Sequence, residues 1–311
     1  NQVYVPVENP DLEIQNDMVY INSGHHGRSI DKNLLKDEII KFINSRKNAS
    51  IEIPIIVTQK EKVDLDSMYE KINFDPINAT TKVENGKLVV VPHKDGVKVD
   101  KEVLKNAIDK INNNENITEK IKVTLIPPEI TQEYMSQNMF RDVIASFSTY
   151  YSTEGQANID RAQNLKVASD KINGKILAPG DIFSFNGTVG ERTEANGFKN
   201  GQVFEGGRIV EGIGGGICQV SSTLYNAALR ANLKIVERVN HMFTVDYVPA
   251  GLDATVAYGS IDFRFQNSTK WPIKIEAFMT ENNQLFMRLI GTKEEADISV
   301  EMYTQLIKTI P

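Results

Sequence analysis

The stretch Gly212-Ile213-Gly214-Gly215-Gly216-Ile217-Cys218-Gln219-Val220-Ser221-Ser222-Thr223-Leu224-Tyr225-Asn226 places a glycine-rich loop directly before a helical pattern. Apolar residues recur at helical spacing after the loop, at Val220, Leu224, Ala228 and Ala231. A helix is therefore predicted to begin close to Cys218, the only cysteine of the chain. The unpaired N–H groups and the dipole at a helix start stabilise an anion, so this position favours a thiolate nucleophile.

Two simpler interpretations of this loop stand beside the nucleophile. A lone cysteine is often a small buried hydrophobe, and a glycine-rich turn into a helix can bind phosphate. The nucleophile is favoured because a cysteine between Gly-Gly-Gly and Gln is not a core pattern, and the spacing fits neither common phosphate-binding motif. Gly215 and Gly216 would let a substrate backbone approach. Gln219 and Ser222 are further candidates for substrate binding.

Composition excludes several classes of function. The chain has 311 residues, 41% of them hydrophobic and 24% charged, which is typical of a globular protein. A net charge of −6 argues against nucleic-acid binding, and no apolar run is long enough for a membrane span. The four histidines do not form a metal site with the cysteine, so neither a metal nor a cofactor is expected. The first residues resemble the interior of a longer chain, so we expect an upstream targeting or anchor segment outside this sequence.

The first 130 or so residues contain an internal repeat, in which residues 27–36 align with residues 96–105. Each copy is predicted to form a strand, a turn, a helix capped by Asp31 or Asp100, and a second strand. We expect two small α+β units, at 1–68 and 69–134, that bind or space something. The histidines of this half lie in polar turns and indicate no catalytic site.

Helices precede strands in the remaining domain, residues 135–311. Apolar residues at helical spacing predict helices at 134–147 and 159–172, in addition to the cysteine helix. Alternating or apolar segments predict strands and hairpins at 182–185, 203–210, 241–247, 261–266, 273–277 and 285–289. This order is typical of an α+β fold in which the cysteine helix packs on an antiparallel sheet, as in papain-like enzymes by analogy.

His241 is the only histidine in the domain of the cysteine, 23 residues after it. A half-buried strand residue is the simpler interpretation, and a Cys–His pair is the functional one. A carboxylate could orient the imidazole. Asp262, Asp253 and Asp246 are candidates that their spacing does not separate, and Asp262 is the first choice.

Two arginines are candidates for holding a carboxylate of the substrate. Arg192 and Arg238 both lie in the domain of the cysteine, and a guanidinium group binds a carboxylate through two parallel hydrogen bonds. Exposed arginines are more often simply solvated.

Five motifs of this domain resemble those of the VanW-domain family, over about residues 137–292. They are residues 179–186 (PGDIFSFN), 189–193 (VGERT), 214–226 (GGGICQVSSTLYN), Glu237-Arg238 with His241, and 247–255 (YVPAGLDAT). The repeated front half more loosely resembles the peptidoglycan-binding domain that often precedes this domain in Gram-positive surface proteins.

The resemblance implies L,D-transpeptidation of peptidoglycan, with 3-3 crosslinks formed through a thioester. Carried over by motif, the nucleophile is Cys218 and the base is His241. The implied partners are peptidoglycan stem peptides, and the implied location is extracytoplasmic, in the cell wall or anchored at the outer face of a Gram-positive membrane. A cysteine carboxypeptidase or endopeptidase and a non-catalytic cell-wall binding module are the alternatives.

Overall fold

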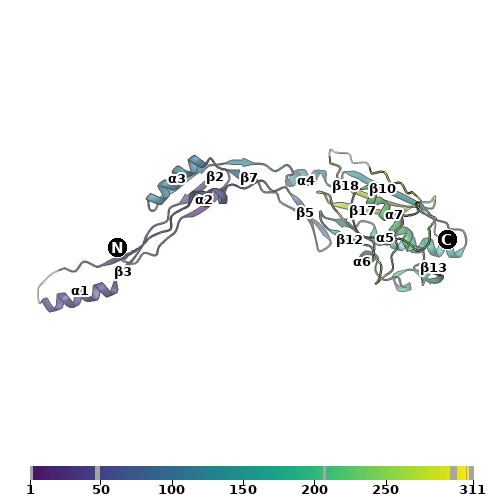
Figure 1. The fold of residues 1–311 in the computed structure, drawn as a ribbon, viewed down its shortest axis with the longest axis horizontal. Coiled ribbons are helices and arrows are strands. Elements are labelled where there is room, and N and C mark those ends of the chain that lie inside the picture. Colours follow the sequence, from purple (N-terminus) through teal and green to yellow (C-terminus); the bar gives the residue numbers. More distant parts are fainter. Residues whose placement is uncertain (1–2, 46–49, 206–207, 295–299, 306, 308–311) are drawn as a thin grey trace. The chain divides into compact units, whose positions relative to one another are not determined.

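The computed structural model describes residues 3–45, 50–205, 208–294, 300–305 and 307 (Figure 1). The chain forms two compact units, Asn1–Asn78 with His93–Glu129 and Ala79–Pro92 with Ile130–Pro311. The fold is a mixture of helices and antiparallel sheets, which confirms the α+β class. The units follow packing and do not coincide with the predicted boundaries after residues 68 and 134, because residues 79–92 pack with the second unit.

The same elements occur twice in the front half. The first copy consists of β1 Asp11–Gln15, β2 Met18–Asn22, β3 Gly27–Ile30, α1 Lys32–Ser45 and β4 Ile55–Thr58. The second consists of β5 Thr80–Glu84, β6 Lys87–Val91, β7 Gly96–Lys98, α3 Lys101–Asn113 and β9 Thr124–Ile126. Pairing is also the same, since β1–β2 matches β5–β6 and β3–β4 matches β7–β9. Asp31 and Asp100 each accept two backbone N–H groups at the helix start, as capping residues do.

The two copied helices differ in burial. Helix α3 buries one apolar stripe, Leu104, Ala107, Ile108 and Ile111, whereas α1 has no buried residue among those described. The stripe of α3 packs on the sheet β1-β2-β8, whose third strand β8 is Thr118–Lys122, and on the short helix α2, Leu65–Ile72. The core of this unit therefore combines parts of both copies.

A four-stranded antiparallel sheet supports the second unit. Its order is β10 Asp142–Tyr150, β18 Gln284–Gly291, β17 Ile273–Met279 and β11 Ile176–Leu177. Strands β17 and β18 alternate so that one face is buried, and helices α5 Gln156–Ile172 and α7 Ile217–Arg230 cover that face. Truncating a core residue such as Leu289 to Ala would cost about 2–5 kcal/mol of stability.

Smaller elements surround this core. They are α4 Gln132–Asn138, β12 Ile182–Ser184, α6 Phe185–Val189, the 3₁₀ turn Glu194–Asn196, β13 Asn200–Glu205, β14 Arg208–Ile213, β15 Lys234–Glu237 and β16 Arg264–Gln266. Strands β12, β16 and β15 form a second sheet, on which Phe183 stacks on Phe265. The hairpin β13–β14, predicted at 203–210, leads into α7, and residues 206 and 207 lie outside the described residues.

Two predictions of secondary structure are wrong. Residues 142–150 form β10 and not the end of a helix, because pairing with β18 outweighs a short run of helical spacing. Residues 241–247 form no strand, and the backbone N–H of His241 donates to the side chain of Asp253 and not to a neighbouring strand. The predicted helices at 159–172 and after the glycine loop are confirmed, as is the last hairpin.

The hairpin β5–β6 has its own small core. Ala79, Met135 and Trp271 are buried together, with Val90 of β6 packed against them. Helix α4 supplies Met135, which is fully buried. A strand pair from the second copy thus covers residues of the second unit.

Candidate active site

Cys218 is the second residue of α7, where backbone N–H groups have no partner within the helix. Its side chain is half-buried and packs on one side against the hydrophobic core. The sulfur contacts the backbone of Val256, whose N–H lies 3.5 Å from Sγ and whose carbonyl oxygen lies 3.6 Å from it. The thiol therefore lies at a helix start, as predicted, and is partly shielded from solvent.

The electrostatic environment of the thiol differs from that expected of a helix start alone. Burial raises the pKa of Cys218, while the Val256 N–H and the charges of Arg192 and Arg161 act in the opposite direction. Burial outweighs them, so the pKa of the thiol lies above its ordinary value and not below it. Without a substrate, the thiol is therefore the resting form.

His241 forms a close pair with Asp253. The ring Nδ1 of His241 lies 2.6 Å from Asp253 Oδ2, and the backbone N–H of His241 donates to the same oxygen at 2.6 Å. Both side chains are less than a tenth exposed. Burial opposes ionisation of Asp253, but the two bonds from His241 hold the pKa of its carboxyl below the usual value. Because Nδ1 is bonded to Asp253, any exchange of a proton with a reacting group would use the other ring nitrogen, Nε2.

Arg238 holds Asp253 in place. Its Nε donates to the carbonyl oxygen of Asp253 at 2.7 Å, and its Nη2 donates to Asp253 Oδ1 at 3.1 Å and to the carbonyl oxygen of Gly251 at 2.9 Å. The sequence predicts Arg238 as a ligand for substrate. The structure places its guanidinium on the segment that carries Asp253.

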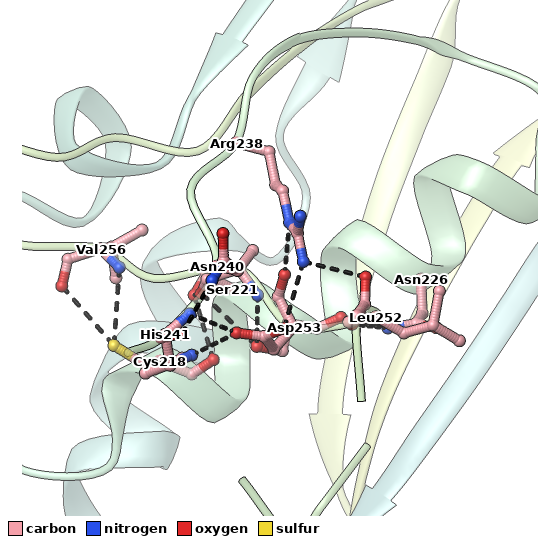
Figure 2. A network of polar contacts seen from close by, with 12 residues as sticks. Cys218, Ser221, Asn226, Arg238, Asn240, His241, Leu252, Asp253 and Val256 are labelled. Carbon is pink, nitrogen blue, oxygen red and sulfur yellow. Dashed lines mark hydrogen bonds and ion pairs between the residues drawn. The ribbon is translucent and has the colours of Figure 1, made fainter. Parts of the chain in front are cut away.

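Helix α7 fixes the same segment through a buried polar face. Ser222 Oγ accepts the N–H of Ala254 at 2.9 Å, and Ser221 Oγ donates to its carbonyl oxygen at 2.6 Å. One turn further along the helix, Asn226 Nδ2 donates to the carbonyl oxygen of Leu252 at 2.7 Å. Figure 2 shows this network, in which Cys218 and His241 are both bonded to the segment 253–256. Ser222, predicted to bind substrate, is fully buried and serves this network.

The side chain of Gln219 is fully engaged by protein groups. Its Nε2 donates to Thr149 Oγ1 at 2.9 Å and to the carbonyl oxygen of Tyr150 at 2.7 Å, and its Oε1 accepts from Arg161 at 2.6 Å. Its exposed fraction is 1%. Gln219 therefore ties α7 to β10 and α5, and its amide donors are not available to an oxyanion.

The backbone geometry of the loop explains why glycine occupies positions 214 to 216. Gly214 and Gly216 have positive φ angles of 87° and 96°, which favour glycine. A Cβ on Gly215 would lie 2.5 Å from the carbonyl carbon of Gly201 in β13. Gly215 and Gly216, predicted to admit substrate, thus let the loop pass close to the hairpin and turn sharply into α7.

Arg192 lies beside the loop, in contact with other protein groups. Its guanidinium donates to the carbonyl oxygen of Gly190 at 3.0 Å and to Asn186 Oδ1 at 2.6 Å. It also lies over the rings of Phe185 and Tyr258. A cavity of about 540 Å³ adjoins these partners, lined among others by Asn186 and Tyr258.

Asp262, the first choice for the third catalytic residue, lies elsewhere. Its carboxylate accepts from Ser184 Oγ at 2.6 Å and from the backbone N–H groups of Asn186 and Phe263. The structure pairs His241 with Asp253 instead, one of the two other carboxylates that the spacing left open. Contacts with Arg238 and α7 hold Asp253 and its segment beside His241, and these contacts could not be predicted from the spacing of residues in the sequence.

Arg161 is the site residue that sequence reasoning misses. It lies on α5, and its Cγ would be 2.6 Å from a Cβ on Gly216. Nothing in its local sequence signals that a loop 50 or so residues later packs on it. Among the described residues, no group of three or more His, Cys, Asp or Glu side chains could hold a metal ion, and no helix has the length and apolar character needed to cross a membrane.

Two family models match the chain. Residues 160–290 match the model described as "VanW like protein", which includes the glycine loop, Cys218, His241 and Asp253. Residues 57–118 match the model described as "Putative peptidoglycan binding domain", which covers most of the second copy of the repeat.

Two curated proteins are similar to the chain. "Uncharacterized protein YoaR" of Bacillus subtilis (strain 168) is 35% identical over 226 residues, which are 72% of this chain and 72% of that protein. "Vancomycin B-type resistance protein VanW" of Enterococcus faecalis (strain ATCC 700802 / V583) is 33% identical over 111 residues, 34% of this chain and 40% of that protein. No solved structure matches the chain.

Proposed function

Because the chain belongs to the VanW family and its front half matches a peptidoglycan-binding model, we propose that it is a cell-wall protein that modifies peptidoglycan stem peptides. The proposed activity is L,D-transpeptidation through a thioester on Cys218. One observation carries the chemistry: the thiol and the His241–Asp253 pair are bonded to one short segment, 253–256, which α7 itself holds in place. This proposal places the protein outside the cytoplasm.

In the first step, Cys218 attacks the carbonyl of the L-centred diamino acid at position three of a donor stem. His241 Nε2 takes the thiol proton, directly or through one water, as Sγ forms its bond to carbon. The carbon–nitrogen bond to the terminal D-alanine then breaks, and the imidazolium gives its proton to the leaving amine. Asp253 keeps the imidazole oriented and stabilises its charged form.

In the second step, the amine of a neighbouring stem attacks the thioester. A new carbon–nitrogen bond forms, the carbon–sulfur bond breaks, and His241 removes the extra proton of the amine and returns it to the sulfur. The backbone N–H of Cys218 is the candidate donor to the oxyanion in both steps, typically worth about 3 kcal/mol, since the N–H groups of Ile217 and Gln219 donate to Gly214 and Gly216. The side chain of Gln219 is not a second donor, since its amide is bonded to Thr149 and Tyr150.

The raised pKa of the thiol fits a mechanism in which proton transfer accompanies attack. A thiol held neutral by burial requires a base at the moment of reaction. His241 is the residue proposed for that task, with its ring held by Asp253.

Intact-mass measurement after incubation with tetrapeptide stems tests the proposal. Because Cys218 is the only cysteine, we expect an increase equal to one tripeptide acyl group, absent in Cys218→Ala. Muropeptide analysis then distinguishes outcomes, since dimers indicate transpeptidation and trimmed monomers indicate that water resolves the thioester. Absence of an adduct, together with unchanged crosslinking by Cys218→Ala, would leave the non-catalytic binding module.

A further inference from the structure

Two arginines flank the loop that precedes the thiol. Arg161 comes from α5, and its stem lies against Gly216, with Cγ and Nε 2.6 and 3.0 Å from where a Cβ would be. Arg192 comes from the segment after α6, and its Cγ lies 2.9 Å from the corresponding position on Gly214. The two cationic side chains thus pack against the loop at the two glycines on either side of Gly215.

Neither guanidinium forms an ion pair with a carboxylate among the described residues. Arg161 donates to the neutral amide oxygen of Gln219, and Arg192 donates to a carbonyl and to the amide oxygen of Asn186. Asp246 and Asp262 favour the charged forms of Arg161 and Arg192 from beyond ion-pair distance. Burial lowers the pKa of both arginines, so two partly desolvated cations lie beside the loop without a close anion.

We infer that Arg161 and Arg192 form a clamp for the C-terminal carboxylate of a donor peptide. The inference rests on the proposed function and names the part of the substrate that the site selects. An incoming anion would supply the charge that the protein does not place there. It would also use the remaining N–H donors of the two guanidinium groups, which suit the planar geometry of a carboxylate.

The position of the clamp limits the length of the donor. Arg161 packs against Gly216 and Arg192 against Gly214, two and four residues before Cys218, so both lie close to the reacting atom. Consecutive Cα atoms are about 3.8 Å apart, so only a carboxylate within a residue or so of the attacked carbonyl can reach them. The site therefore selects stems with one residue after the diamino acid, which are tetrapeptides, over longer stems.

Binding to the full chain carrying Cys218→Ala tests the clamp without chemistry. The probes are a tetrapeptide, L-Ala, γ-D-Glu, L-diamino acid and D-Ala, with either a terminal carboxylate or a terminal carboxamide, measured by titration calorimetry. We expect Arg161→Gln and Arg192→Gln each to weaken binding of the carboxylate peptide about tenfold or more. Binding of the carboxamide peptide, already weaker, should change less than twofold.

Arg230→Gln is the matched control. Arg230 is another half-buried arginine whose pKa burial lowers, but it lies at the opposite end of α7. It should leave binding of both peptides unchanged. Arg161→Lys and Arg192→Lys keep the charge without the planar group and should give intermediate losses, which serves if a Gln variant melts early.

The outcomes separate the clamp from the enzyme. Equal weakening of both peptides, no weakening, or no binding by the Cys218→Ala chain would overturn the clamp. Discrimination between the peptides without an acyl adduct on the wild-type protein would keep the clamp and end the transpeptidase. An adduct that forms equally well with the carboxamide peptide and in both arginine variants would keep the transpeptidase and end the clamp.

Discussion

Asp253 and Asp262 both lie on the chain that follows α7, yet they bind different kinds of groups. Asp253 accepts the ring and the backbone N–H of His241, and Arg238 anchors it. Asp262 accepts hydrogen bonds from the Ser184 hydroxyl in β12 and from the backbone N–H groups of Asn186 in α6 and of its neighbour Phe263. The first carboxylate bonds to an imidazole ring, and the second bonds to a hydroxyl and to backbone N–H groups. Bonding partners, and not spacing in the sequence, therefore distinguish the carboxylate proposed for catalysis from the one that holds the fold together.

Removing the imidazole should have the largest effect. We expect His241→Ala to lower the rate of adduct formation at Cys218 by about 10²–10⁴-fold at pH 7, because the neutral thiol then lacks its base. The rate is measured by time-resolved intact mass. His93→Ala, a histidine in the other unit, should keep the wild-type rate. A normal rate in His241→Ala would remove the reason for assigning a catalytic role to Asp253.

Substituting asparagine for Asp253 or Asp262 tests directly whether the two carboxylates differ in function. Asp253→Asn should lower the acylation rate about 10²-fold or more, because the amide no longer stabilises the imidazolium or fixes its tautomer. Asp262→Asn should leave the rate per folded molecule within about twofold. Both rates come from the same mass assay, corrected for folded fraction by circular dichroism. Equal loss in the two variants would contradict the assignment.

For the free energy of unfolding, we expect substitution of Asp262 to have a large effect, in contrast to its small effect on the acylation rate. Asp262→Ala leaves a part-buried backbone N–H of Asn186 without its acceptor, so we expect a loss of about 2 kcal/mol or more in the free energy of unfolding. Urea denaturation measures it. Asp170→Ala removes an exposed i,i+4 ion pair with Lys166 and should cost less than about 0.5 kcal/mol. A loss no greater than that of the control would show that Asp262 does not hold β12 and α6.

The pH dependence of stability should involve Asp253. Its folded pKa is lower than its unfolded value, so its contribution is present above the unfolded pKa, near 4, and is lost as pH falls through the folded pKa. The stability difference between wild type and Asp253→Asn should therefore shrink when urea denaturation is repeated from pH 6 down to pH 3. A difference that stays constant over this range would contradict the lowered pKa.

Ser184→Ala should have the smallest effect. Its hydroxyl donates to Asp262 and accepts the N–H of Gly187 as the cap of α6, so we expect a loss of about 1 kcal/mol. The loss should be smaller but not absent when Asp262 is already Ala, since the bond to Asp262 is then gone while the cap on the Gly187 N–H remains. Additive losses in the double variant, measured by denaturation, would show that the bond carries little energy.

Much of the fold could be predicted because its periodicity is strong. Helix α7 and the hairpin of β17 and β18 follow from apolar spacing, and the glycines before Cys218 locate the helix start. Strand β10 could not, because Val143, Ile144 and Phe147 happen to match helical spacing and only β18 decides otherwise. A short run of apolar spacing therefore predicts the wrong secondary structure where a strand distant in the sequence supplies the hydrogen bonds.

The two central residues of the candidate site could be chosen from the sequence, but the residues that hold them in place could not. Cys218 and His241 are singled out by being the only residues of their kind in the domain. Asp253 was one of three candidates, with Asp262 as the first choice, and it is placed by Arg238 and Ser222, which were both predicted to bind substrate. Polar residues that hold a loop together have no spacing rule of their own.

The hairpin β5–β6 matters to anyone who divides this protein into fragments. A shortened version beginning near residue 130 would keep every residue of the proposed catalytic centre but would lose the strands that cover Met135 and Trp271. It would expose an aromatic side chain to water and invite aggregation, which would be mistaken for poor folding of the enzyme itself. A version beginning before Ala79 retains that cover and is the sounder starting point for isolating the second unit.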